Sequence, residues 1–176
     1  MRCGEHFRGP RWPREKPRRA KPVGLDSGDA RASTRDGTMS PPLRLRPVSI
    51  EIEVPFHDVD ALGVVWHGHY YKYLELARTR LFRSIGLDAG DLIGPRYRFV
   101  VAESRCRHGF PLRYGDRARV DAWLRDVRNR IHVAFEITNL THARRAARAK
   151  TVLVTLDASG RLLLETPDEI LRRIQP

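Results

Sequence analysis

The sequence of 176 residues has few cysteines and no long apolar run. Its two cysteines, Cys3 and Cys106, form neither a CxxC pair nor a metal-ligand spacing, and they are too few for a disulfide framework. We therefore expect a reducing, cytoplasmic environment. Runs such as ALGVVW and TVLVTL are among the longest apolar stretches, and they fall short of the roughly 18 residues that cross a bilayer. No membrane partner is expected.

Acidic residues are outnumbered, since 33 Lys and Arg face 21 Asp and Glu and leave a net charge of +12. Such an excess favours an acidic partner. Basic residues recur in the C-terminal half at Arg125, Arg128, Arg130, Arg144, Arg145, Arg148 and Lys150. No helix-turn-helix, zinc-finger or aromatic RNA-binding pattern accompanies this stripe, so we do not expect nucleic acid. A solvated basic surface is the simpler reading, and a narrower one is that some arginines hold the phosphates of a small cofactor or an acidic carrier.

The first 38 residues differ in composition from the rest of the chain. Residues 1–38 are rich in Arg, Pro, Gly and Asp and lack a periodic apolar face, so they bury too little surface to offset the entropy of ordering. They also lack the hydrophobic segment of a secretory signal. We expect a disordered extension, or a true start at Met39, followed by one folded domain over residues 39–176.

Apolar periodicity predicts the elements of that domain. The alternation in VSIEIEVPF predicts a strand over Val48–Phe56, and apolar residues at spacings of three and four predict a helix of four to five turns from Gly68 to Gly86. TPDEILRRI predicts a closing helix with Thr166 as N-cap and Pro167 at its first position. Four more strands are expected at Tyr97–His108, Ala118–Val127, Ile131–Leu140 and Ala147–Leu156.

This order of elements predicts an α+β protein in which an antiparallel five-stranded sheet wraps around one long central helix. Such a sheet leaves its other face and its edges uncovered. A second copy could pair with them, so we expect a homodimer or homotetramer.

Ionisable residues crowd the stretch HDVDALGVVWHGHYYKYLELAR. Asp58, Asp60, His67 and His69 are all possible metal ligands. Side chains two residues apart share a face on a strand but diverge on a helix, and the predicted helix begins within this stretch. We therefore expect neither a metal nor another cofactor, and we interpret Asp58 as structural.

Asp60 is open to two interpretations. An aspartate before a turn is often only a turn former. Here Gly63 permits a tight turn, whose amides, with those at the helix start, could hold an oxyanion. A carboxylate that faces a carbonyl held in this way is a hydrolytic site. His67 could orient the substrate or a water, or make a structural hydrogen bond.

The run DALGVVWHGHY resembles the signature of the hotdog-fold acyl-CoA thioesterases of the 4-hydroxybenzoyl-CoA thioesterase family. That signature is Asp, two residues, Gly, Val-Val, one residue, His, two residues and an aromatic, and all its positions match between Asp60 and Tyr70. YLELAR and FPLRYGDRARV resemble the helix and second-strand motifs of that family. The resemblance covers roughly Val48–Ile174.

The resemblance implies hydrolysis of acyl-CoA without a cofactor, at sites between subunits. It implies that Asp60 acts on the thioester carbonyl as nucleophile or general base and that His67 lies in the same site. We place five residues on the substrate side: Gly63, Val64, Val65, Tyr70 at the acyl-pocket wall, and Glu75, which could serve the site or a dimer contact.

Two residues depart from the family pattern: Val59 replaces the usual Thr or Cys, and His69 replaces a frequent Asn. The variant VVWHGHY with Trp66 also resembles thioesterases of pigment clusters, which act on an acyl carrier protein. Two alternatives therefore stay open, an acyl-carrier-protein thioesterase and a basic binding module without catalysis.

Overall fold

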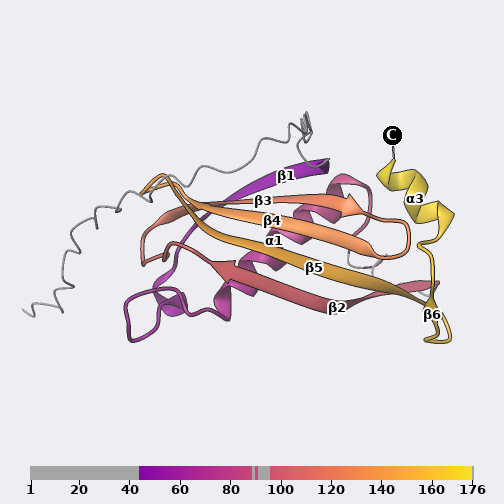
Figure 1. Cartoon of the computed structure of the whole chain (residues 1–176), viewed down its shortest axis with the longest axis horizontal. Coiled ribbons are helices and arrows are strands. Elements are labelled where there is room, and N and C mark those ends of the chain that lie inside the picture. Colours follow the sequence, from indigo (N-terminus) through magenta and orange to yellow (C-terminus); the bar gives the residue numbers. More distant parts are fainter. Residues whose placement is uncertain (1–43, 89, 91–95, 176) are drawn as a thin grey trace, which may run out of the picture. The chain divides into compact units, whose positions relative to one another are not determined.

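The computed structural model describes residues 44–88, 90 and 96–175 (Figure 1). The predictions for residues 1–38 and for a start at Met39 lie outside these residues. Within them, none of the helices combines the length and the apolar character that a membrane crossing requires.

The domain is built on an antiparallel sheet with the strand order β1-β3-β4-β5-β2, and β6 pairs with β5. The strands are β1 (Leu45–Glu53), β2 (Tyr97–His108), β3 (Arg117–Asp126), β4 (Ile131–Asn139), β5 (Arg144–Asp157) and β6 (Leu162–Leu163). The α+β hotdog fold is thus confirmed. The prediction of five strands was incomplete, because β6 is only two residues long and carries no alternation to detect.

The predicted first strand was placed too late. It spans Leu45–Glu53 and not Val48–Phe56, because Pro55 cannot donate a ladder hydrogen bond and precedes the 3-10 helix η1 (Phe56–Asp58). This early stop directs the chain away from the sheet. The 15 residues between β1 and the helix α1 (His69–Ser84) therefore form a connection that contains the candidate site.

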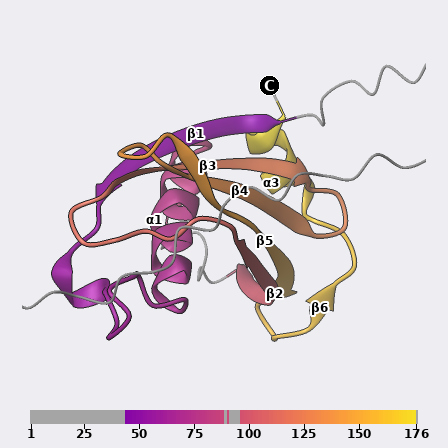
Figure 2. The same ribbon diagram turned by 60° about the vertical axis from the view of Figure 1, so that its left-hand side comes forward.

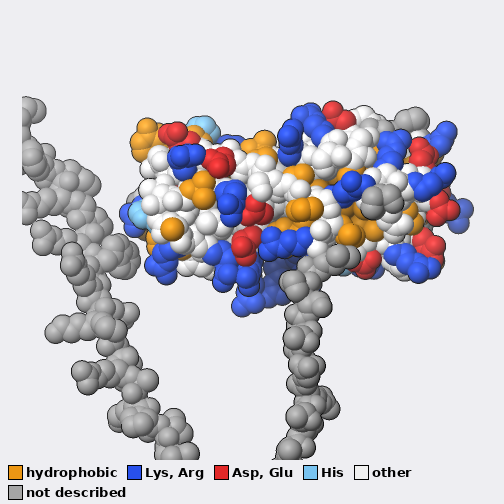
Figure 3. All heavy atoms as spheres, turned by 90° about the horizontal axis from the view of Figure 1, so that it is seen from above, with side chains coloured by type: hydrophobic (Ala, Val, Ile, Leu, Met, Phe, Trp, Pro, Cys, Tyr) orange, Lys and Arg blue, Asp and Glu red, His pale blue; other side chains and the backbone are white. Residues whose placement is uncertain are grey.

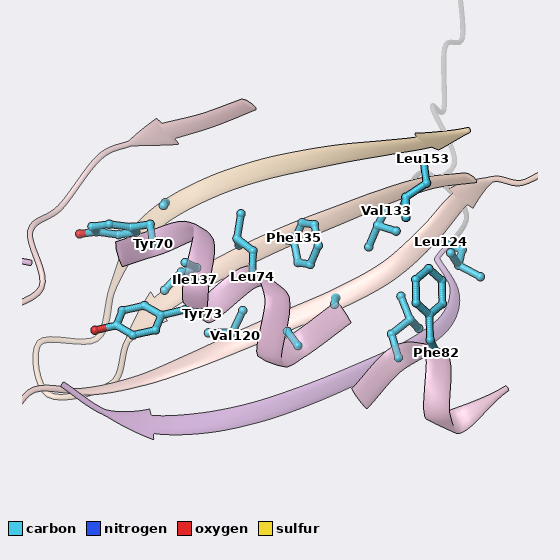
Figure 4. Packing of buried hydrophobic residues seen from close by; sticks show 14 of the residues in the cluster. Tyr70, Tyr73, Leu74, Phe82, Val120, Leu124, Val133, Phe135, Ile137 and Leu153 are labelled. Atoms are coloured by element: carbon cyan, nitrogen blue, oxygen red, sulfur yellow. The ribbon is translucent and has the colours of Figure 1, made fainter. Parts of the chain in front are cut away.

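Helix α1 packs across one face of the curved sheet, which we call the inner face (Figures 1 and 2). Its buried side chains recur at the predicted spacing and meet apolar side chains of the strands, as Figure 4 shows. The helix stops as predicted at Gly86, whose φ of +72° suits the left-handed position after a helix. The Gly86 N–H donates to Arg83 O, and the Leu87 N–H donates to Phe82 O.

The second helix of the described domain, α3 (Asp168–Ile174), closes one end of the core through Ile170 and Ile174. The prediction for its start was wrong. Pro167, not Thr166, takes the N-cap position, with a ψ of 141° that is not helical. Thr166 instead donates its main-chain N–H to Arg128 O at 2.7 Å, which ties the segment before α3 to the turn after β3.

Candidate active site

A tight turn between η1 and α1 holds Asp60. The Asp60 N–H donates to Val64 O and the Gly63 N–H donates to Asp60 O, both at 2.9 Å. Gly63 has a φ of +75°, a conformation that costs little only for glycine. Val59 and Val65 pair on either side as an antiparallel bridge. The turn is therefore a small closed hairpin with Asp60 at its first corner.

One oxygen of the Asp60 carboxylate accepts a hydrogen bond, and the other accepts none from the described residues. Its Oδ1 accepts the Leu62 N–H at 2.8 Å, the local bond of an aspartate that forms a turn. Among the described residues, no group donates to its Oδ2, and the side chain is half-buried. The turn-forming and catalytic interpretations are therefore compatible, because the turn fixes the direction of the carboxylate through Oδ1 and leaves Oδ2 without a hydrogen bond from the described residues.

The chain between this turn and α1 has two main-chain N–H groups, those of His67 and Gly68, that donate to no acceptor in the described part of the chain. Their neighbours are paired, because the Trp66 N–H donates to Asp58 O and the His69 N–H donates to Trp66 O. Trp66 covers this point, because a Cβ on Gly68 would overlap its indole ring.

His67 lies beside Trp66, with the two ring centroids 4.9 Å apart, and its side chain is exposed. No hydrogen bond or ion pair joins it to Asp60 within residues 44–88, 90 and 96–175. The loop thus carries both predicted catalytic residues without joining their side chains directly.

A buried carboxylate ties this loop to α1. The Asp58 side chain is 1% exposed. The Tyr73 hydroxyl donates to its Oδ2 at 2.7 Å, and Lys72 Nζ lies 3.0 Å from Oδ1 and 3.2 Å from Oδ2. His69 Nδ1 lies 3.0 Å from the Asp58 main-chain oxygen. The structural interpretation of Asp58 fits these contacts, which are with the helix and not with a turn of its own.

These contacts shift two pKa values. Burial favours the protonated form of Asp58, but the hydrogen bonds from Tyr73 and Lys72 outweigh it, so the pKa of Asp58 lies below its ordinary value. Burial, followed by the hydrogen bond to Asp58, raises the pKa of the Tyr73 phenol. At neutral pH the pair is therefore a carboxylate that accepts from a neutral phenol.

Three predicted substrate-side residues pack into the domain. Val64 is half-buried, Val65 is 4% exposed and Tyr70 is 3% exposed. The Val65 N–H donates to Leu112 O at 2.8 Å. Tyr70 lies edge-on against His108, with centroids 4.5 Å apart. These residues support the loop from the core side.

Glu75 lies apart from the loop. Its side chain is 55% exposed and forms an ion pair with Arg78 on the same helix. It lies six positions after His69 at the start of α1, a rise of about 9 Å. Among the described residues, no contact joins Glu75 to the Asp60 turn, so its place on the substrate side stays a prediction.

His108, at the end of β2, is a neighbour that the sequence did not reveal. Burial, and then the charge of His67, lowers the pKa of His108. Its Nδ1 lies 4.0 Å from the Sγ of Cys106, whose pKa is raised by burial. Burial thus favours the neutral form of this thiol, although an imidazole lies beside it. His67 and His108 are 41 positions apart, so no local pattern could pair them.

None of the described residues gather as three or more His, Cys, Asp and Glu side chains in an arrangement that could hold a metal ion.

Replacing Tyr73 with Phe tests the tie between loop and helix. We expect Tyr73→Phe to lower the free energy of unfolding by about 1–2 kcal/mol, because Asp58 loses a buried donor. Tyr71→Phe is the matched control, since Tyr71 is 38% exposed on the same helix and should change stability little. Urea denaturation measures both, and equal effects of the two substitutions would contradict the role given to Tyr73.

The lowered pKa of Asp58 predicts a pH dependence of stability. The folded pKa lies below the unfolded value of about 3.9, so the contribution of the ionised group is present above that pH and is lost as the pH falls through the folded pKa. His57 and His69 also face Asp58 Oδ1, at 3.5 and 3.3 Å. The stability difference between wild type and Asp58→Asn should be constant from pH 5 to 5.5 and shrink below about pH 4. A difference that grows on acidification would reverse the assigned sign.

Comparison with known proteins places this chain in a family. Residues 54–174 match the thioesterase-like superfamily. A Synechocystis protein described as a candidate esterase is 31% identical over 67% of this chain and 72% of its own length. An acyl-CoA thioester hydrolase from Escherichia coli is 27% identical over 58% of this chain and 71% of its own length.

Solved structures share the fold. One is an Asp-to-Asn variant of a 4-hydroxybenzoyl-CoA thioesterase in complex with 4-hydroxybenzoyl-CoA. It superimposes with a TM-score of 0.65, is 17% identical, and is covered over 99% of its length and 74% of this chain. The sequence resemblance to hotdog thioester hydrolases is confirmed, and the chain belongs to the thioesterase-like superfamily.

Proposed function

We propose that this protein hydrolyses acyl-CoA thioesters to a free acid and CoA, with Asp60 as the catalytic carboxylate. The observation that carries the proposal is the Oδ2 atom of Asp60, which sits in a tight turn and accepts no hydrogen bond from a described residue. A few residues later, the main-chain N–H groups of His67 and Gly68 have no acceptor among the described residues. The names of the relatives support the reaction class. The substrates named for those relatives do not identify the acyl group on which this chain acts.

Asp60 can act in two ways. As a nucleophile, its carboxylate oxygen attacks the thioester carbon, the CoA thiolate leaves, and water then cleaves the resulting anhydride. As a general base, it takes a proton from a water whose oxygen attacks the same carbon. Both routes consume one water and release a carboxylic acid and a thiol.

The start of α1 supplies the complement to this carboxylate. In the transition state the carbonyl oxygen becomes negative, and the N–H groups of His67 and Gly68 are donors for it. The N-terminal end of the helix dipole adds a favourable field. The side chain of His67 is exposed beside Trp66, where it can orient the substrate. Tyr70 supports the loop from below and can form the inner wall for the acyl group.

A homodimer would complete the site. Strand β2 is an edge strand of 12 residues, and its Val100 and Val101 are 45% and 43% exposed. Helix α1 packs mainly on β1 and β3, so it leaves the β2 edge open. Pairing of two β2 edges would bury these valines and extend the sheet. It would also bring a second copy next to His108, and hence next to the loop of the first.

Replacing Asp60 with Asn tests the catalytic assignment. Asn keeps an acceptor for the Leu62 N–H but cannot act as nucleophile or base, so we expect kcat for acyl-CoA to fall by about 100-fold or more with little change in Tm. Asp157→Asn is the matched control, because Asp157 Oδ1 also accepts the N–H two residues on, from Ser159 at 2.8 Å. Thiol release from a panel of acyl-CoAs measures both, and wild-type rates in Asp60→Asn would remove Asp60 from the mechanism.

Adding a charge to the β2 edge tests the dimer. We expect the wild type to sediment at twice the 20.3 kDa chain mass and Val100→Asp to sediment as a monomer of much lower activity. Leu164→Asp adds the same charge at an apolar residue that is 79% exposed outside β2, and it should remain dimeric. A fully active wild-type monomer would contradict a site shared between subunits.

A further inference from the structure

The sheet face opposite α1, which we call the outer face, is hollowed and basic. A cavity of about 630 Å³ lies over β3, β4 and β5. It forms where the small side chain of Ala134 stands in one cross-strand row between Trp123 and Lys150. Most drug-sized and cofactor-sized ligands occupy cavities of about 300–1,000 Å³, so the space suits a small molecule.

Four cations form a block beside this cavity. Arg105 stands opposite Lys150, and Arg107 stands opposite Arg148, in neighbouring positions of β2 and β5. The four, with Ala149, line a second hollow of about 220 Å³. Like charges directly opposite each other on paired strands are destabilising. Two such pairs side by side are therefore an electrostatic cost that a bound anion would relieve.

The carboxylates near this block offset only part of its charge. Lys150 pairs with Glu103 at 2.7 Å, and Arg148 pairs with Glu136 at 3.0 Å. Arg105 and Arg107 form no ion pair with any described residue. Six Lys and Arg side chains line the two hollows against two carboxylates: Arg44, Arg105, Arg107, Arg125, Arg148 and Lys150 against Asp126 and Glu136. Figure 3 shows Lys and Arg side chains over much of the surface in that view, with one group at the lower edge of the domain.

Trp123 adds an unsatisfied donor to the wall of the cavity. The residue is 9% exposed, and its indole N–H is buried without an acceptor among the described residues. The guanidinium of Arg44 lies over its ring at 4.1 Å. A buried donor without a partner costs about 1–3 kcal/mol, and a ligand oxygen could satisfy it after a small movement of Arg44.

We propose that the outer face binds a compact polyphosphate of nucleotide size between the Arg105, Arg107, Arg148 and Lys150 block and Trp123. Arginine forks match phosphate oxygens, and several phosphates are needed to neutralise the block. A second copy of the same face would bring two positive surfaces together. The basic residues that the sequence singles out lie on β3, on β5 and in the turn between β3 and β4. Arg144 and Arg145 start β5 at one end of β4, whereas Arg128 and Arg130 lie in the turn at its other end.

The site does not depend on the proposed catalysis, because it lies on the sheet and not in the Asp60 turn. The phosphates could come from a free nucleotide or from the nucleotide end of a CoA substrate. Both share the same chemistry, so binding and kinetics must be measured on the same variants.

Calorimetric titration with ATP and with inorganic tripolyphosphate, without divalent cations, tests the proposal on the full chain. We expect both to bind, and Arg107→Gln and Arg148→Gln each to raise Kd about tenfold or more, the loss of one charge-assisted contact. Arg80→Gln removes the same charge from the exposed side of α1 and should bind as wild type does. Asp60→Asn should also bind normally, so failure of the catalytic proposal leaves this result intact.

Thioester kinetics of Arg107→Gln identify the source of the phosphates. A raised KM for acyl-CoA with unchanged kcat assigns them to the substrate, and an unchanged KM with lost ATP binding assigns them to a free nucleotide. Both results support the site. Absence of ATP and tripolyphosphate binding at millimolar concentration, equal weakening in Arg80→Gln, or binding of an acidic carrier protein alone would overturn it.

Discussion

The buried carboxylate of Asp58 is the constraint on which the candidate site depends. The chain leaves the sheet at Pro55 and must return to start α1, and Val59 and Val65 anchor this crossing to the core on one side. Asp58 holds the crossing in place because Tyr73 and Lys72 of the helix donate to its side chain while Trp66 donates to its main-chain oxygen. Removing one partner would leave a buried charge short of a donor. The loop and the helix start are therefore fixed relative to each other by polar contacts, and the sheet core fixes the helix.

Two aspartates in one short motif consequently lie in different environments. Asp58 is buried, fully engaged and held ionised by its donors, so it is unsuited to turnover. Asp60, two residues later, is half-buried and has only one oxygen engaged by its own turn. Environment, and not residue type, separates a structural carboxylate from a reactive one. In the proposed mechanism, the tight turn at Gly63 aims the Asp60 carboxylate, and the helix start that Asp58 holds supplies the main-chain amides.

The sequence could predict those parts of the molecule that local patterns determine. Apolar periodicity and turn residues predicted α1 with its end marked by Gly86, β2 at its observed bounds, and the tight turn at Gly63. Errors occurred where a short-range rule competed with tertiary packing, as at Phe56 and Thr166, or where β6 was too short to show a period. The partners of Asp58 could not be predicted, because Lys72 and Tyr73 look like ordinary helix residues until the fold brings them to the loop. The like-charged pairs of β2 and β5 likewise appear only once the strand register is known.

The most direct measurement is a crystal structure of the Asp60→Asn protein with a bound acyl-CoA. We expect the thioester carbon to lie within about 3.5 Å of the residue 60 side chain, the reach of a reacting group. We also expect the carbonyl oxygen within hydrogen-bonding distance of the His67 or Gly68 N–H, with a second copy of the chain against β2. A thioester bound away from this loop, or a carbonyl oxygen held by side chains elsewhere, would contradict the account.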